Sequence, residues 1–169
     1  MRTRKLLTAV SAVGMWIGLL ALAGCDRPSK LEEGVSSELE VRKEFGEPVT
    51  VTVMPDGSRI MEFPRQPEGW TNYLITIGTD GKMSALRQLL NADNFSRVKP
   101  GLSQLEVRSI LGRPAKMTPY ALKNEEVWDW RFKPQQESKI FSVTFGPDKR
   151  VVATATMDDP RESLSGGRN

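Results

Sequence analysis

Hydrophobic and polar residues alternate in short runs along most of the chain. The runs cover residues 49–53, 60–63, 73–77, 83–90, 127–132, 140–145 and 150–156. A period of two is typical of strands that bury one face. Turn sequences such as Pro55-Asp56-Gly57 and Thr79-Asp80-Gly81 separate the first runs. The pattern therefore predicts antiparallel strands joined by tight turns.

Two short helices are predicted ahead of the strand runs. Ser37 and Ser103 are suitable N-cap residues, and Glu40 and Glu106 follow them three residues later, which completes two capping boxes. Each predicted helix ends at a Gly-x-Pro sequence, a common stop signal. A further short helix is expected over residues 91–98, where the first half of the chain has only residues 29–33.

The two halves of the chain repeat each other. Leu39-Glu40-Val41-Arg42 recurs as Leu105-Glu106-Val107-Arg108, and Gly46-Glu47-Pro48 recurs in form as Gly112-Arg113-Pro114, both at an offset of 66 residues. The later runs match at offsets of 67 and 68 residues, which indicates a tandem duplication with two single-residue length changes in loops.

The duplication predicts an α+β fold of two tandem repeats. Each repeat should have short helices followed by a three- to four-stranded antiparallel sheet. We place the first repeat at residues 25–90 and the second at residues 91–157. Residues 158–169 have no periodicity and are expected to be a disordered tail.

The N-terminus has the organisation of an export signal. Basic residues precede an uncharged segment over residues 6–23. Leu22-Ala23-Gly24-Cys25 resembles the lipobox of bacterial lipoprotein precursors, so residues 1–24 are expected to be a signal peptide. The resemblance implies that Cys25 carries a diacylglyceryl group and, on its new amine, a palmitate-like chain. A membrane-spanning anchor and a buried thiol are the alternatives.

Removal of the signal changes the charge of the protein. The sequence has 24 Lys+Arg and 21 Asp+Glu, and three of the basic residues lie in the signal, so the mature chain is neutral. The basic character is therefore no indication of nucleic-acid binding. The chain has no His and a single Cys, so the commonest catalytic and metal-binding groups are missing. We expect no catalytic residue, no metal site and no cofactor.

The second half resembles the SmpA/OmlA domain of the BamE-like outer-membrane lipoproteins. The residues that carry the resemblance are Val98-Lys99-Pro100-Gly101-Leu102-Ser103-Gln104-Leu105-Glu106-Val107, Leu111-Gly112-Arg113-Pro114, Val127-Trp128-Asp129-Trp130-Arg131-Phe132 and Val143-Thr144-Phe145. With the first copy, which matches more loosely, it covers nearly all of residues 25–157. It implies two short helices followed by an antiparallel three-stranded sheet, similar to one repeat of the β-lactamase-inhibitor-protein fold.

The same resemblance implies a function. Members of this family are accessory, non-enzymatic subunits of the machinery that inserts β-barrel proteins into the outer membrane, with contacts to partner subunits and to anionic phospholipid. This chain differs in having two such domains. A second difference is Asp26, because an acid after the lipid-bearing Cys resembles the inner-membrane retention signal of enteric bacteria. We expect a lipid-anchored protein on the periplasmic face of the outer membrane, with the inner membrane as the alternative.

Aromatic residues of two segments are candidate binding residues. In a strand over residues 127–132, Trp128, Trp130 and Phe132 share one face, which is either the core of the sheet or a partly open partner surface. Trp70 lies opposite Tyr73 and Ile77 by strand parity, and Ser138 is its counterpart in the second copy. It is therefore either an interaction residue or a cover for the sheet edge near Pro67.

Basic residues gather around the second predicted helix. Arg97, Lys99, Arg108 and Arg113 are candidates for contact with phospholipid headgroups, and solvated helix charges are the alternative. The leading functional prediction is a scaffold lipoprotein in outer-membrane protein assembly and envelope integrity. The rival is an inhibitor-like protein that docks on a periplasmic hydrolase, and an enzyme is the least favoured class.

Overall fold

The computed structural model describes residues 28–161; the expected signal peptide, Cys25, Asp26 and residues 162–169 lie outside the described residues. The first repeat begins with a 3-10 turn, η1 (Pro28–Lys30), followed by helix α1 (Glu38–Phe45). Its antiparallel sheet has the order β1-β2-β3-β4. The strands are β1 (Thr50–Val53), β2 (Arg59–Pro64), β3 (Asn72–Ile77) and β4 (Met83–Gln88).

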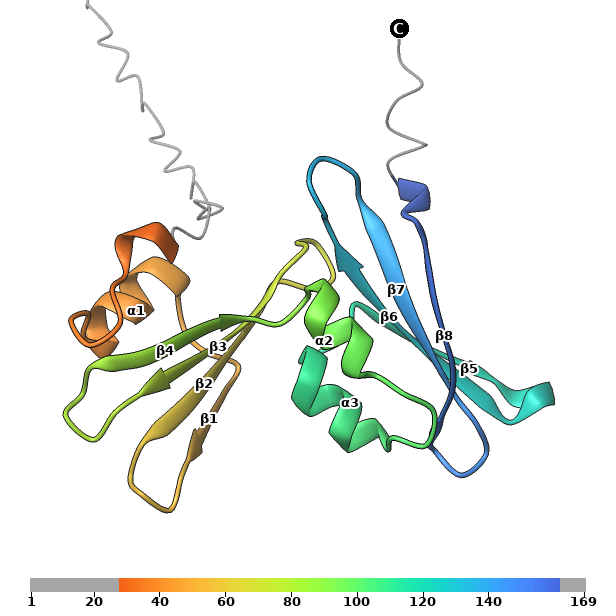
Figure 1. Ribbon diagram of the computed structural model, residues 1–169, viewed down its shortest axis with the longest axis horizontal. Helices are drawn as coiled ribbons and strands as arrows, with labels where there is room; N and C mark the ends of the chain where they lie inside the picture. Colours follow the sequence, from red (N-terminus) through yellow and green to blue (C-terminus); the bar gives the residue numbers. More distant parts are fainter. Residues whose placement is uncertain (1–27, 162–169) are drawn as a thin grey trace, which may run out of the picture.

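The second repeat has the same order of elements. Helices α2 (Ala92–Arg97) and α3 (Gln104–Leu111) precede strands β5 (Lys116–Tyr120), β6 (Glu125–Phe132), β7 (Lys139–Phe145) and β8 (Val151–Asp158), with a 3-10 turn η2 (Ala121–Lys123) between β5 and β6. These strands form a second antiparallel sheet, β5-β6-β7-β8. Figure 1 shows α2 and α3 lying between the two sheets. The predicted α+β fold of two tandem units is confirmed.

Irregular features recur at equivalent places in the two sheets. The pairing of β3 with β4 shifts register between Thr76 and Ile77, and that of β7 with β8 shifts between Thr144 and Phe145, 68 residues later. Both predicted capping boxes form, on Ser37 and on Ser103. Bulges are conserved among related structures. A bulge and a cap at matched positions therefore indicate that both repeats derive from one unit, and the duplication is visible in the structure as well as in the sequence.

Each repeat has its own hydrophobic core. In the first, Val41 and Phe45 of α1 pack on Met61, Phe63, Tyr73, Ile75, Ile77 and Met83. In the second, Val107 and Leu111 of α3 pack on Trp128, Trp130, Phe141, Val143, Phe145 and Val151. Core residues alternate along β3 and β7 as the sequence pattern predicts. Each helix therefore covers one face of its own sheet.

Three expectations about the strands need correction. Val49, Val51 and Val53 were expected to be half-buried, but they are 54, 42 and 68 % exposed, because β1 is an edge strand beyond the cover of α1. Strand β5 has no counterpart among the predicted runs, since its sequence contains Pro119 and lacks strict alternation. The expected tail does not start at residue 158, because β8 extends to Asp158 and Asp159 is 3 % exposed.

Within residues 28–161, none of the helices combines the length and the apolar character needed to cross a lipid bilayer.

Candidate functional site

The two repeats meet where the end of α3 rests on the first sheet. Asn72, at the start of β3, is fully buried, and its Nδ2 donates hydrogen bonds to the carbonyl oxygens of Leu111 at 2.8 Å and Arg113 at 2.9 Å. Glu62 of β2 accepts from the backbone N–H of Arg113 at 3.1 Å and pairs with Arg108 at 3.7 Å. The first sheet thus satisfies polar groups that the end of a helix leaves unpaired.

A second set of contacts joins the loop between β2 and β3 to strand β6. The side-chain amide of Gln66 donates to the carbonyl oxygen of Arg131 at 2.8 Å and accepts from its N–H at 3.2 Å. The Arg131 guanidinium donates back to the carbonyl oxygen of Pro67 at 2.9 Å. This exchange resembles strand pairing, so it fixes the loop against the second repeat.

Trp70 belongs to this junction. Its indole N–H donates to the Ser138 hydroxyl at 2.7 Å, and the Arg131 guanidinium carbon and Lys133 Nζ lie 5.6 and 4.9 Å from its ring centroids. Trp70 precedes β3, so strand parity does not apply to it, but its half-buried side chain does lie outside the core of its own repeat and contacts the other repeat. Its role as a partner-binding residue stays a prediction.

The Arg131 guanidinium that contacts Trp70 is also part of a buried ion pair. Arg131 Nε is 2.5 Å from Asp159 Oδ2, and the two side chains are 9 and 1 % exposed. Burial by itself raises the pKa of Asp159, but hydrogen bonds from the Arg161 N–H, Arg131 and Ser138 outweigh it, so the pKa lies below its ordinary value. Asp159 is therefore ionised at neutral pH and balances the buried guanidinium.

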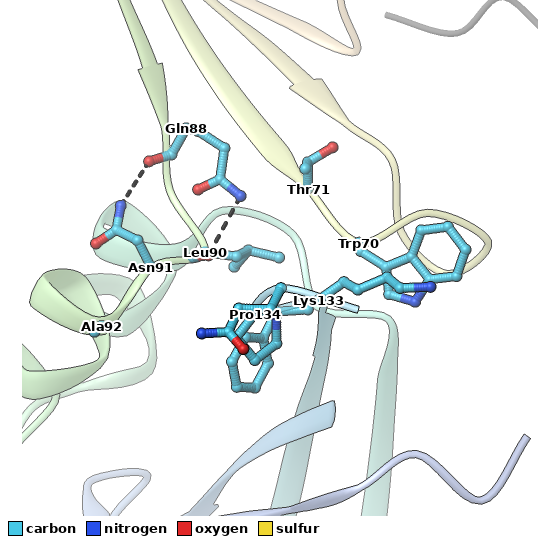
Figure 2. A pocket seen from close by; sticks show the side chains of 10 residues that line it. Trp70, Thr71, Gln88, Leu90, Asn91, Ala92, Lys133 and Pro134 are labelled. Carbon is cyan, nitrogen blue, oxygen red and sulfur yellow. Dashed lines mark hydrogen bonds between the residues drawn. The ribbon is translucent and has the colours of Figure 1, made fainter. Parts of the chain in front are cut away.

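A groove of about 460 Å³ opens beside the junction, and Figure 2 shows the side chains around it. Apolar parts come from Trp70, Leu90, Phe132 and Pro134. Gln88 lies at the edge of the groove, and its side-chain Nε2 donates to the Leu90 carbonyl at 3.3 Å. Its side-chain Oε1 is buried and has no hydrogen-bond partner among the described residues. Both repeats thus contribute walls to this groove.

Trp128 and Trp130 lie in the core of the second repeat. They are 7 and 0 % exposed, and Trp130 donates its indole N–H to the Gly112 carbonyl at 3.1 Å. Trp128 donates to Glu126, and this hydrogen bond is the main reason why the pKa of Glu126 is lowered. The prediction that these two tryptophans belong to the core of the sheet is confirmed, and the alternative of an open aromatic face is wrong.

The four predicted basic residues separate into two groups. Arg97 and Lys99 are exposed, and Arg97 donates to the Asn94 side chain at 2.9 Å. Arg108 pairs with Glu62 at the junction, and the backbone N–H of Arg113 binds the same carboxylate. Arg97, Lys99 and the exposed side chain of Arg113 therefore stay candidates for contact with anionic headgroups, whereas Arg108 belongs to the contact between repeats.

An apolar hairpin tip is a candidate surface that the sequence alone did not predict. Met117, Tyr120 and Leu122 are 56, 49 and 103 % exposed on β5 and the turn that follows. Tyr120 and Leu122 line a shallow hollow of about 330 Å³ at residues 119–123. The signal was present as an apolar Tyr120-Ala121-Leu122 sequence between lysines, but it has no period that would mark it.

Among residues 28–161, no group of three or more His, Cys, Asp or Glu side chains lies close enough together to hold a metal ion.

A comparison with models of known protein families and with curated protein sequences gives no match for this chain. Among solved structures, a candidate osmotically inducible lipoprotein, OsmE, is similar at 17 % identity and a TM-score of 0.37, over 47 % of this chain and 93 % of that chain. A DUF4309 family protein (YjgB) from Bacillus subtilis is similar at 15 % identity and a TM-score of 0.31, over 76 % of this chain and 82 % of that chain.

A candidate β-lactamase inhibitor protein from Streptococcus mutans is similar at 13 % identity and a TM-score of 0.32, over 73 % of this chain and 83 % of that chain. All three TM-scores lie below 0.5. These likenesses therefore say nothing about the activity of this chain.

Proposed function

We propose that this protein is a lipid-anchored scaffold that assists the assembly of outer-membrane β-barrel proteins from the periplasmic face of the membrane. The lipobox-like sequence at Cys25 and the resemblance to the SmpA/OmlA domain support the anchor and the role. Anionic phospholipid near Arg97 and Lys99 is a second proposed contact.

The observation that carries the proposal is the apolar tip of the β5–β6 hairpin. Leu122 is fully exposed, and half-exposed Tyr120 lines the same hollow beside it. Exposed apolar side chains that cluster on an ordered element are typical of protein interaction surfaces. The junction between the repeats holds the tip on one continuous body through Asn72 and Arg131, which suits a scaffold that presents a fixed surface.

The test is capture of partners from detergent-solubilised membranes with the full lipidated chain. Wild-type protein is expected to retain subunits of the barrel-assembly machinery, and Leu122→Asp is expected to lose them. Leu39→Asp is the matched control, because Leu39 is 76 % exposed at the start of α1, where an acid is compatible with the helix dipole.

Two results would overturn the proposal. Capture of a single soluble periplasmic hydrolase, in place of assembly subunits, would make the protein inhibitor-like. Equal loss of partners with both Asp variants, or with neither, would remove the hairpin tip as the contact surface.

A further inference from the structure

The outer edge of strand β8 differs from the equivalent edge of the first repeat. In the first repeat, β4 is covered by the segment before α1. Gly34 N–H donates to the Met83 carbonyl, Met83 N–H donates to the Ser36 carbonyl, and the Leu86 N–H donates to the Glu33 carboxylate at 2.7 Å. The carboxylate thus blocks a backbone group that would otherwise be open to another strand.

In the second repeat this cover stops earlier. Gly101 and Leu102 bind Val151 of β8 in the same way as their counterparts bind Met83. The residue before the glycine is Pro100, where the first repeat has Glu33, so it has no carboxylate to reach the next outward N–H. Within the described part of the chain, residues 28–161, the edge of β8 is therefore covered only as far as Val151.

Strand parity shows which backbone groups face outward beyond Val151. The Asp159 N–H donates inward to the Ser138 carbonyl of the neighbouring chain segment. Alternation along an antiparallel ladder then turns the N–H groups of Thr154, Thr156 and Asp158 away from β7. Among residues 28–161, no hydrogen bond reaches the outward N–H of Thr154 or Thr156.

The side chains of this edge permit close approach by another strand. Residues 152–158 are all exposed, and their sequence is Val-Ala-Thr-Ala-Thr-Met-Asp. This segment contains no proline and one charged residue. Natural edge strands are usually protected by proline, lysine or a short length. Strand β5 has Pro119 and Lys116, and β1 has only four residues. Strand β8 has none of these protections along its uncovered part.

We propose that the uncovered edge of β8 pairs with β8 of a second copy of this chain, antiparallel and about a two-fold axis at Ala155. The covered residues before 152 set one limit of the pairing, and the end of β8 at Asp158 sets the other. Pairing centred on Ala155 places Thr154 opposite Thr156 of the partner copy, so outward backbone groups meet outward backbone groups. The two copies would then share one continuous eight-stranded sheet.

Charge also favours a second copy as the occupant. Asp158 is the only charged residue of the free edge, and in this pairing it faces Val152 of the partner copy, not another acid. Asp158 already pairs with Lys139 of β7 at 2.9 Å, so its charge is balanced within one copy. Because the interface is symmetric about a two-fold axis, each contact occurs twice and the assembly stops at a dimer. Seven paired residues make a small interface, which we expect to be weak and to need the high local concentration of a membrane surface.

The test is disulfide trapping of the full chain in the oxidising periplasm of a bacterial host. Ala155→Cys puts two thiols across a non-hydrogen-bonded pair, where Cα atoms lie about 4.5 Å apart and can be bridged. Ala153→Cys is the matched control, because Ala153 is exposed on the same face. The two Ala153 residues would lie roughly 13 Å apart along the pairing, which is too far for a bridge.

We expect a reductant-sensitive dimer band on denaturing gels for Ala155→Cys, and none for Ala153→Cys or for the wild-type chain with its single Cys25. Adding Thr154→Pro to Ala155→Cys should abolish the band while the melting temperature holds, because the N–H that proline removes faces away from β7. The inference is overturned if Ala155→Cys stays monomeric, if both cysteine positions cross-link equally, or if Ala155→Cys joins a different protein.

Discussion

Trp70 and Ser138 occupy equivalent positions in the two copies, yet they bond to each other across the junction. This contact could not arise from the repeat unit alone, because it depends on how one copy is set against the next. A tryptophan that looks free within its own repeat is therefore used between repeats. Arg131 is a similar case, since strand parity places it on the open face of its sheet and the first repeat and Asp159 bury it.

The Trp70 contact predicts a loss of stability on truncation. Trp70→Phe keeps a ring but removes the indole N–H, and should lower the free energy of unfolding by about 1 kcal/mol. Trp70→Ala also uncovers Arg131 and should cost about 2 kcal/mol. Denaturant titration of both variants measures the difference. Wild-type midpoints in both would show that the junction does not depend on this side chain.

Asp159 predicts an acid dependence of the junction. Its pKa is lowered in the folded protein, so the ionised form adds stability that is present above its ordinary pKa of 3.8 and is lost as the pH falls through the folded pKa. Asp159→Asn should destabilise the protein by about 3 kcal/mol at pH 7, because the buried guanidinium of Arg131 loses its charged partner. The gap between the two proteins should shrink below about pH 4. A pH-independent gap in the melting curves would contradict this.

At the scale of elements, the two helices end alike but meet different surroundings. Gly46 and Gly112 have φ of 78° and 71° with ψ near −160°, a region that side chains other than glycine rarely adopt. Both therefore require glycine for the backbone. Only Gly112 also approaches the first repeat, since a Cβ there would lie 3.1 Å from Asn72 Nδ2 and 3.2 Å from Leu89 Cδ1.

The pair gives a matched mutational test. Gly46→Ala should cost about 1 to 2 kcal/mol from backbone strain. Gly112→Ala should cost more, by roughly another 1 kcal/mol, because Asn72 has to move from the carbonyl groups of α3. The free energies of unfolding of the two variants decide this. Equal losses of stability in the two variants would mean that Asn72 and Leu89 can move away from a Cβ at position 112 without a loss of free energy.

At the scale of the whole molecule, the expected anchor decides where the protein acts. Cys25→Ser should leave an uncleaved or soluble protein, because without the thiol no diacylglyceryl group can be attached and several acyl chains are needed for stable binding to a membrane. Membrane fractionation with labelled lipid measures both effects. Normal fractionation and lipid incorporation by the variant would disprove the lipobox assignment. Its folding should be unchanged, which its melting temperature checks.

The sequence by itself determined the repeat unit of this protein. Capping boxes, Gly-x-Pro stops and period-two alternation are local, so they can be read without knowing what lies nearby. They correctly predicted α1, α2, α3 and all strands except β5, and they assigned Trp130 to the core as the favoured alternative. The duplication itself followed from four identical residues in a row.

Only the tertiary structure decided how the two units are joined and which surfaces remain open. The partners of Trp70, Asn72 and Arg131 lie tens of residues away in the chain, and no local pattern encodes their approach. The same reason explains why the exposed Leu122 tip and the uncovered edge of β8 were not foreseen. Exposure depends on what every other segment fails to cover, and that is a property of the whole packed chain.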